Sequence, residues 1–288
     1  MADLKQRSHD EPFLSIILPA YNEEKRLPPT LARIAAYLRS CDFASEILVV
    51  ENGSTDRTAA VVEDFRANSV ADEDPFRVHL LHSSKGKGNA IRHGILTGRG
   101  EYLLISDTDL AVPIEEVAHF LPPSLPAEAY DIAIASREVA GSVRHGEPFY
   151  RHLMGRVFNM LVRQLAIPGL HDTQCGFKVF HRTVARQIFP LQRVEGWGFD
   201  VEVLYIAQQH GMTVVEVPVN WYYGQDSRVR PFFDTFTMIR DLLEIRRNGR
   251  KGYYDRLVAE AAPAPAATST GASGATKVAD GDLHTLSG

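Results

Sequence analysis

Two aspartates separated by one residue, Asp107 and Asp109, are the side chains in this sequence best suited to chemistry. They follow the apolar run of residues 102–105, which is typical of a buried strand. Alternate residues of an extended chain share a face, so both carboxylates could reach one cation. A hard divalent ion held by one or two carboxylates keeps positions free for substrate phosphates. Taken alone, the pair fits a turn with a helix-capping aspartate at least as well.

Polar residues also close two earlier apolar runs. Residues 19–24 read Pro-Ala-Tyr-Asn-Glu-Glu, and residues 51–56 read Glu-Asn-Gly-Ser-Thr-Asp. A tyrosine there can stack on a base, and a neighbouring acid can bind ribose hydroxyls or base N–H groups. Each segment alone is explained equally well as a capped turn. Because ligands of open α/β sheets bind at the carboxyl ends of the strands, three such ends together favour a ligand site.

A loop of glycines and lysines, residues 85–90, precedes a predicted helix and reads Lys-Gly-Lys-Gly-Asn-Ala. Glycines let a backbone approach phosphate, while lysines and a helix N-terminus offer positive potential. The dinucleotide fingerprint is incomplete because Ile91 occupies its sixth position. The loop alone is therefore better explained as a solvated basic turn.

Strands and helices must alternate to position these segments. Apolar runs predict strands at residues 13–18, 46–50, 77–81, 101–106, 131–135 and 213–219. Helical spacing predicts helices at residues 27–38, 54–65, 90–96, 149–165, 200–209 and 232–247. Ser54, Thr55 or Asp56 would cap the second helix. This alternation predicts an α/β fold with a largely parallel sheet flanked by helices.

Composition excludes several classes of protein. The 288 residues, 44% hydrophobic and 23% charged, fit one globular α/β domain. The net charge of −5 argues against nucleic acid as a partner. Two distant cysteines, Cys41 and Cys175, predict neither a zinc site nor a disulfide framework. A polar N-terminus and the lack of a membrane-spanning apolar run predict a cytoplasmic protein, with contact to a membrane surface left open.

Four segments are expected along the chain. Residues 1–11 would form a flexible leader, and residues 12–230 the main domain. Residues 231–257 combine an apolar stripe with arginines, which suits either a helix on anionic lipid or a helix packed on the core. Residues 258–288 are rich in Ala, Pro, Ser, Thr and Gly and predict a disordered tail.

The chain resembles family 2 glycosyltransferases of the GT-A fold, and among them the polyprenyl-phosphate (dolichyl-phosphate) β-glucosyltransferases. The family motifs are SIILPAYNEE at 15–24, ILVVENGSTD at 47–56, KGKGNAIRHGI at 85–95 and ISDTDL at 105–110. The closer match rests on ASR at 135–137, DTQCGFKVF at 172–180, WGFDVEVLYIA at 197–207 and EVPVNW at 216–221. The resemblance covers residues 13–229.

This resemblance implies roles for individual residues. Asp107 and Asp109 would hold Mg²⁺ or Mn²⁺ against the donor diphosphate, and Gln174 and Asp200 would lie near the transferred sugar; these four are the expected catalytic residues. Mannosyl-transferring relatives often place a third metal ligand where this chain has Ala111. That difference favours UDP-glucose as donor. The expected nucleotide-sugar site comprises Pro19, Ala20, Tyr21, Glu23, Glu51, Asn52, Asp56, Lys87, Asp107 and Thr108.

A lipid phosphate acceptor already carries negative charge, so it needs no side-chain base. It needs cations that hold it beside the donor diphosphate, and arginine suits phosphate oxygens. Arg137, Arg151 and Arg156 are the candidates, and Arg151 and Arg156 lie on the predicted helix of residues 149–165. A salt-bridged helix surface is the alternative for these arginines.

Four other functions stay open. A GDP-mannose-dependent polyprenyl-phosphate mannosyltransferase would share the fold. A family 2 transferase with a soluble saccharide acceptor would need a carboxylate base, for which Asp200 or Glu202 is available. An aspartate-nucleophile phosphatase wants Gly-Thr after its second aspartate, where this chain has Leu110 and Ala111. A nucleotide-sugar sensor without activity would keep the same binding residues.

Overall fold

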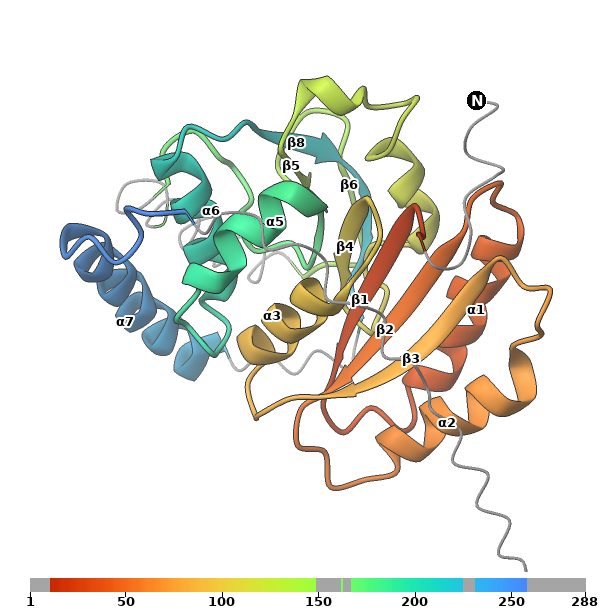
Figure 1. Cartoon of the computed structure of the whole chain (residues 1–288). Coiled ribbons are helices and arrows are strands. Elements are labelled where there is room, and N and C mark those ends of the chain that lie inside the picture. The colour runs from red at the N-terminus through yellow and green to blue at the C-terminus, as the bar shows by residue number, and fades with distance from the viewer. Residues whose placement is uncertain (1–10, 149–161, 163–166, 225–230, 258–288) are drawn as a thin grey trace, which may run out of the picture.

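The computed structural model describes residues 11–148, 162, 167–224 and 231–257. Within them, a seven-stranded sheet has the order β3-β2-β1-β4-β7-β5-β8 (Figure 1). Neighbouring strands are parallel except that β7 runs antiparallel to both β4 and β5. The strands are β1 (Leu14–Ala20), β2 (Ser45–Glu51), β3 (Phe76–His82), β4 (Tyr102–Ser106), β5 (Ile132–Ser136), β7 (Phe177–His181) and β8 (Val214–Pro218). The predicted α/β fold with a largely parallel sheet is confirmed.

Helices cover both faces of the sheet (Figure 1). The described α-helices are α1 (Leu27–Arg39), α2 (Thr58–Ser69), α3 (Lys87–Thr97), α5 (Arg182–Ile188), α6 (Phe199–Gln209) and α7 (Pro231–Arg250). Short 3₁₀ helices occupy Ile114–His119, Ala127–Ala129 and Phe189–Leu191. A parallel two-stranded sheet joins β6 (Val143–His145) to β9 (Asn220–Tyr222).

Two apolar cores follow from the alternation of side chains along the central strands. Ile16 of β1 points to a core shared with α1, whereas Ile17 points to a core shared with α3, α5 and α6. Both side chains are fully buried. Burial on both faces explains why the central strands are nearly continuous apolar runs.

Strand β7 and helix α5 were missed from the sequence, as were β6 and β9. The apolar residues of β7 lie inside a longer motif and show no signal for direction. Its pairing with β4 sets Ser106 opposite Phe177, so the residues before β7 reach the end of β4. Strand β7 therefore brings residues 172–176 to the carboxyl end of β4, next to Asp107.

The starts of helices α2 and α3 differ from prediction, and α2 and α7 also extend a few residues beyond their predicted ends. Helix α2 begins at Thr58 instead of residue 54, because Ser54, Thr55 and Asp56 form hydrogen bonds with the loop after β1. Helix α3 begins at Lys87 instead of residue 90. The helix expected over residues 149–165 lies outside the described residues except for Val162, which is buried.

The expected leader lies outside the described residues except Glu11, and the expected C-terminal tail lies wholly outside them. Among the described helices, none combines the length and apolar character that a bilayer crossing requires.

Candidate active site

Strands β1, β2 and β4 all end at the same edge of the sheet. They are parallel neighbours, and Ala20 pairs with Glu51 at the last register position of β1 and β2. The backbone continues this contact, since Asn52 N donates to Ala20 O at 3.1 Å. The three segments singled out from the sequence therefore start side by side, as the fold prediction required.

The loops after β1 and β2 are clasped together by reciprocal hydrogen bonds. Asn22 adopts a left-handed conformation (φ 52°), which asparagine tolerates well. Its backbone N donates to Ser54 Oγ at 3.0 Å, and its Oδ1 accepts from Thr55 N at 2.8 Å. Further along, Glu24 N donates to Asp56 Oδ2 at 3.1 Å. These bonds hold the two loops against each other.

Two residues of the expected nucleoside site, Asp56 and Glu23, already bind other groups of the protein. Asp56 also accepts from Thr58 N at 3.0 Å, and Glu23 forms a two-pronged ion pair with Arg26, with both bonds at 2.6 Å. Asn52 differs, since its side chain is buried and its Oδ1 has no hydrogen-bond partner among the described residues. Asn52 thus presents a free acceptor at the strand end.

The carboxylate of Glu51 accepts from Ser54 N and contacts His82 Nδ1 at 3.1 Å. Burial acts to raise the pKa of this carboxyl, but the hydrogen bonds outweigh it and leave the pKa lowered. Glu51 is therefore an anion at neutral pH. Tyr21 lies nearby on the β1 side, with Lys85 Nζ 5.4 Å from the centroid of its ring.

Lys87 joins the glycine-lysine loop to the aspartate pair. Its Nζ lies 2.6 Å from Asp107 Oδ1 and 4.7 Å from the ring centroid of Trp197. Burial tends to lower the pKa of the ammonium, but the charges of Asp107 and Asp200 outweigh this effect and raise it. Lys87 is therefore a fixed positive charge next to the first aspartate.

Asp109 is exposed on a tight turn. Its Oδ1 accepts from Ala111 N at 3.1 Å, and Leu110 N donates back to Asp107 O at 3.2 Å. Leu110 has φ 46° and a buried side chain, an uncommon conformation for a branched residue. The pKa of Asp109 is raised, because surrounding protein atoms displace water and because the Asp107 charge is close. Two carboxylates crowded in this way favour a bound cation.

The backbone before β7 presses against the first aspartate. A Cβ on Gly176 would lie 2.0 Å from Asp107 Oδ2, so only glycine fits at this position while Asp107 keeps its place. Thr108 is held separately, since its carbonyl accepts from Thr30 Oγ1 of α1 at 2.6 Å. The backbone around the aspartate pair is thus fixed from both sides.

Asp200 at the start of α6 completes the charged cluster. Its Oδ1 accepts from Lys178 Nζ at 2.6 Å, and Lys178 also donates to Cys175 O at 2.6 Å. Both side chains are buried. Burial raises the pKa of Asp200, and the Lys178 and Lys87 charges oppose that rise. The structure therefore brings Asp200 within electrostatic reach of Lys87 and Asp107.

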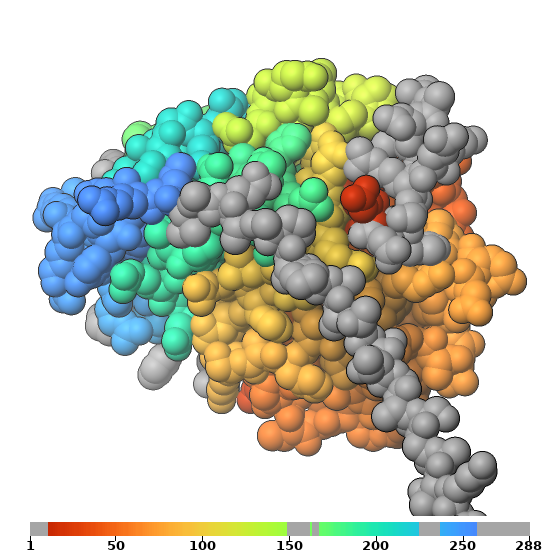
Figure 2. All heavy atoms as spheres, viewed as in Figure 1, coloured from red at the N-terminus to blue at the C-terminus, as the bar shows by residue number. Residues whose placement is uncertain are grey.

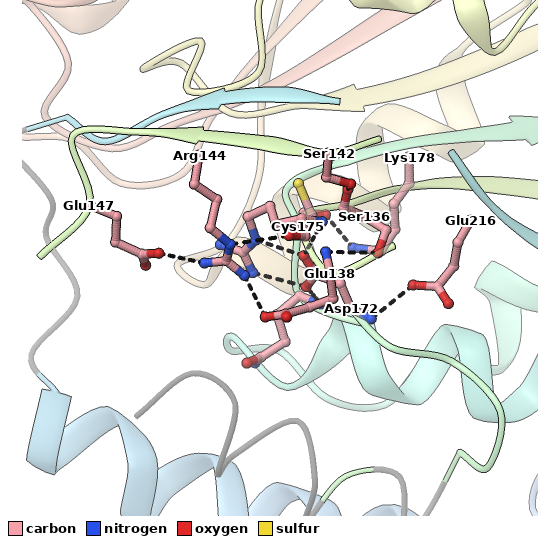
Figure 3. A network of polar contacts seen from close by, with 11 residues as sticks. Ser136, Glu138, Ser142, Arg144, Glu147, Asp172, Cys175, Lys178 and Glu216 are labelled. Atoms are coloured by element: carbon pink, nitrogen blue, oxygen red, sulfur yellow. Dashed lines mark hydrogen bonds and ion pairs between the residues drawn. The ribbon is translucent and has the colours of Figure 1, made fainter. Parts of the chain in front are cut away.

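A polar network that includes Asp172 and Cys175 links the segment before β7 to the residues that follow β5 (Figure 3). Arg137 grips Asp172 through two bonds, Nε to Oδ2 at 2.6 Å and Nη2 to Oδ1 at 2.9 Å. Arg144 donates to Glu147 at 2.6 Å and to the Arg137 carbonyl at 3.1 Å. Arg137, a candidate for the acceptor phosphate, is thus already paired with a carboxylate.

The other acceptor candidates and Gln174 are placed less completely. Arg151 and Arg156 lie outside the described residues. Gln174 N donates to Asp172 Oδ1 at 3.3 Å, and its side-chain amide lies 3.7 Å from Met238 Sδ of α7. Gln174 therefore stands between the polar network and the last helix.

The donor atoms around Asp107 and Asp109 suit a cation that a substrate helps to bind. Within the described part of the chain, no group of three or more His, Cys, Asp or Glu side chains is placed to hold a metal ion. Two carboxylates are enough for Mg²⁺ or Mn²⁺ when phosphate oxygens complete the shell. The residues present fit such an ion, with Lys87 as the partner of Asp107 until it binds.

The model of the family described as glycosyl transferase family 2 matches residues 15–189. This range contains the ends of β1, β2 and β4, while Asp200 at the start of α6 lies beyond it. The chain belongs to glycosyl transferase family 2. It is therefore a glycosyltransferase, as its sequence motifs predicted.

Relatives from several organisms are similar over most of the chain. The dolichyl-phosphate beta-glucosyltransferase of Dictyostelium discoideum is 35% identical over 256 residues, 82% of this chain and 75% of that protein. The protein of the same name from Homo sapiens is 38% identical over 248 residues, 81% of this chain and 74% of the relative.

Solved structures show the same GT-A fold. Glucosyl-3-phosphoglycerate synthase from Mycobacterium tuberculosis, in complex with UDP, superposes with a TM-score of 0.59 at 18% identity. The match covers 81% of this chain and 80% of that one. Its complex with Mn²⁺, UDP and glucosyl-3-phosphoglycerate gives the same TM-score, identity and coverage.

Sequence reasoning missed three residues of this family 2 site. Gly176, Lys178 and Trp197 each lie inside a quoted motif, but nothing in their types or spacing tied them to Asp107, Asp200 or Lys87. A lysine between apolar residues in Phe-Lys-Val-Phe was the available signal, because a lysine at a buried strand position needs a buried acid as partner.

Proposed function

We propose that this glycosyltransferase transfers glucose from UDP-glucose to polyprenyl (dolichyl) phosphate with inversion at the anomeric carbon. The observation that carries the proposal is the contact of Lys87 with Asp107 beside the exposed Asp109, which sets one cation and two acids where a sugar nucleotide would place its diphosphate. The relatives at 35–38% identity, whose names refer to glucose transfer and to dolichyl phosphate, support glucose as the transferred sugar and a polyprenyl phosphate as the acceptor.

The donor nucleotide would occupy the edge formed by the ends of β1 and β2. Tyr21 offers a ring face to the base, and the unpaired Oδ1 of Asn52 can accept from a base N–H. Glu51, Glu23 and Asp56 build the walls of this part of the site. A solved protein of the same fold holds Mn²⁺ together with UDP-glucose.

The chain's own residues would handle charge and orientation during transfer. Lys87 would move its ammonium from Asp107 to a diphosphate oxygen, and Asp107 and Asp109 would then hold Mg²⁺ or Mn²⁺. That ion would neutralise the charge that develops on the departing UDP. Asp200, with its charge balanced by Lys178, would orient the hydroxyls of the transferred sugar.

The acceptor phosphate would attack without help from a base. A phosphate oxygen bonds to the anomeric carbon from the face opposite UDP, and the bond between that carbon and the β-phosphate oxygen breaks with its electron pair going to UDP. Arg137, Arg151 and Arg156 would balance the charge of the acceptor. Arg137 keeps N–H groups beyond the two that bind Asp172.

The state of the two candidate bases favours the lipid phosphate over a saccharide acceptor. Asp200 is bound to Lys178, and Glu202 is fully buried with its oxygens bound to Tyr254 and to the backbone N–H groups of Arg193 and Val194. Both oxygens of Glu202 are therefore occupied, and one oxygen of Asp200 is held by the Lys178 ammonium, which makes each a poor base for a sugar hydroxyl.

The membrane face of the enzyme would be the outer side of α7. Leu242 and Ile245 are buried against α6, so the opposite side of the helix faces outward. Among the helix side chains whose burial is described, the exposed ones are Arg240, Leu243, Glu244, Arg247 and Arg250, and the exposed Lys251 follows directly after the helix. Four positive charges around one exposed leucine suit an anionic lipid surface, where the acceptor resides.

The test is transfer of label between phases. The full-length protein is incubated with Mg²⁺ or Mn²⁺, UDP-[¹⁴C]glucose and polyprenyl phosphate, and the products are partitioned between water and organic solvent. We expect label in the organic phase. Asp109→Asn should reduce this label at least about 100-fold, because the metal ion that would neutralise the charge on the departing UDP loses one of its two carboxylate ligands.

Two parallel reactions decide between the donors and acceptors. GDP-[¹⁴C]mannose replaces the glucose donor in one, and soluble glycosides replace the lipid in the other. The variant Asp72→Asn, an exposed carboxylate away from the site, serves as control and should match the wild type. Label that stays in water on a soluble product, or full activity of Asp109→Asn, would overturn the proposal.

A further inference from the structure

We propose that Tyr254, in the turn that follows α7, positions Lys87 for the donor diphosphate through a chain of hydrogen bonds that runs by way of Glu202 and the segment of residues 192–195. The role of Lys87 toward the diphosphate is taken from the proposed function. Tyr254 does not touch a substrate, so it is a positioning residue.

The first links join the C-terminal turn to α6. Tyr254 is fully buried, and its hydroxyl donates to Glu202 Oε1 at 2.6 Å. The second oxygen of Glu202 accepts from the backbone N–H groups of Arg193 at 2.9 Å and Val194 at 2.7 Å. A fully buried carboxylate needs such donors, so Glu202 holds the turn and the 192–195 segment together.

The next links join that segment to the loop that carries Lys87. Gln192 Nε2 donates to Gly88 O and to Val194 O, both at 2.9 Å, and Gly88 N donates to Glu195 O at 2.8 Å. The approach is close enough that a Cβ on Gly88 would lie 2.4 Å from Val194 O. The residue next to Lys87 is therefore bound on both of its backbone polar groups.

The same segment also sets the side chain of Lys87. Two residues after Glu195, the ring of Trp197 lies 4.7 Å from Lys87 Nζ. The backbone of Lys87 and the aromatic face beside its ammonium thus depend on one segment. A shift of that segment moves Lys87 relative to Asp107, because Asp107 is held separately at the end of β4.

The geometry allows the hydroxyl of Tyr254 to be removed without loss of the turn. The carbonyl of Tyr254 contacts His210 Nε2 at 2.5 Å, and Gln209 Nε2 donates to Asp255 Oδ1 at 3.0 Å. The ring itself packs against Tyr205 with centroids 6.0 Å apart. Tyr254→Phe keeps these contacts and leaves Glu202 short of one donor.

The experiment is a double-mutant cycle on the full-length chain, with UDP and Mg²⁺ binding measured by titration calorimetry. We expect Tyr254→Phe to weaken UDP binding about fivefold, a coupling size found for residues that share one network. In the background of Lys87→Met, the same change should have no further effect. Steady-state assays should show a raised KM for the donor and an unchanged KM for the acceptor.

Tyr253→Phe is the matched control, because it removes a hydroxyl from the adjacent residue, whose side chain is 44% exposed. It should bind UDP like the wild type. The inference would be overturned if Tyr254→Phe lowered the thermal stability but left the affinity for UDP unchanged. It would also be overturned if Tyr254→Phe weakened UDP binding equally in the wild type and in the Lys87→Met background. If UDP binds but no lipid product forms, the proposed function fails while the cycle still decides the role of Tyr254.

Discussion

Asp107 lies between a lysine and a glycine. The lysine pairs with the charge of its carboxylate, and the glycine leaves the space that the carboxylate fills. Lys87 holds its charge through a 2.6 Å ion pair, while the missing side chain of Gly176 leaves room for its second oxygen. Both neighbours come from segments far from Asp107 in the sequence. The position of a single carboxylate therefore depends on three separate parts of the chain.

Replacing Gly176 by alanine should displace the Asp107 carboxylate. The backbone at Gly176 cannot retreat easily, because the next residue, Phe177, is paired with Ser106 in the sheet. We expect kcat/KM to fall about 10- to 100-fold, as for other groups that orient metal ligands. The free energy of unfolding should fall by about 1–3 kcal/mol.

Gly224→Ala is the control, since Gly224 is exposed and a Cβ there would meet no atom within 4 Å. Calorimetric titration of Mn²⁺ with UDP and urea unfolding are measured for both variants. Unchanged affinity and activity in Gly176→Ala would show that Asp107 does not need its present position.

At the scale of elements, the network of Figure 3 fastens the end of β5 to the start of β7. Arg137 follows β5, and Asp172 precedes β7. Glu216 of β8 adds a third element, since its carboxylate accepts from the backbone N–H groups of His171 and Asp172, both at 2.9 Å. Three neighbouring strands are thus joined beside the active edge.

This fastening should depend on pH. Burial tends to raise the pKa of the Asp172 carboxyl, but Arg137 outweighs burial and lowers the pKa to about 2. The unfolded value is about 3.9. A carboxyl whose pKa is lower in the folded state stabilises the fold above about pH 4, and this contribution is lost as the pH falls from about 4 toward 2.

Asp172→Asn should therefore destabilise the protein more at neutral pH than in acid. We expect a loss of about 3–5 kcal/mol near pH 7, because Arg137 is left without its partner. The loss should be about 1 kcal/mol smaller near pH 3. Urea unfolding at both pH values measures the difference, with the exposed Glu73→Gln as control. An equal loss at both pH values would contradict the assignment.

Most helices and strands could be predicted from the sequence, because the spacing of apolar residues shows which side of each element is buried in the fold. The start of α2 could not, since Ser54, Thr55 and Asp56 are capping types that here bond to a loop more than thirty residues away in the chain. The pairing of Arg137 with Asp172 was hidden for the same reason: partners distant in sequence leave no local pattern.

At the scale of the whole molecule, charge is distributed unevenly. The chain carries a net charge of −5, yet among the side chains of known burial the outer side of α7 and the adjoining Lys251 expose four positive residues and one glutamate. In the space-filling view, α7 forms one end of the molecule beside the segment that contains α5 and α6 (Figure 2). The basic side thus belongs to the part of the protein that also supplies Asp200 and Tyr254.

Vesicle binding tests this basic side. We expect the protein to sediment with vesicles that contain phosphatidylserine, to ignore phosphatidylcholine vesicles, and to be released at high salt. Reversing two charges, Arg247→Glu with Arg250→Glu, should weaken binding at least about tenfold, since each cation near such a surface contributes about 1 kcal/mol.

Arg33→Glu with Arg66→Glu is the matched control, because both residues are exposed on helices that cover the other face of the sheet. Equal sedimentation of the two double variants would contradict the membrane role of α7. Their circular dichroism spectra should be the same as that of the wild type.

The reversed direction of β7 has one more consequence. Because β5 runs toward the active edge and β7 runs away from it, residues 137–176 leave the sheet and return to it at the same edge. A change in the length of this connection would leave the strand order unaltered, because both of its ends lie at one edge of the sheet. Related enzymes that share the donor half could therefore differ in what they glycosylate by exchanging this one block.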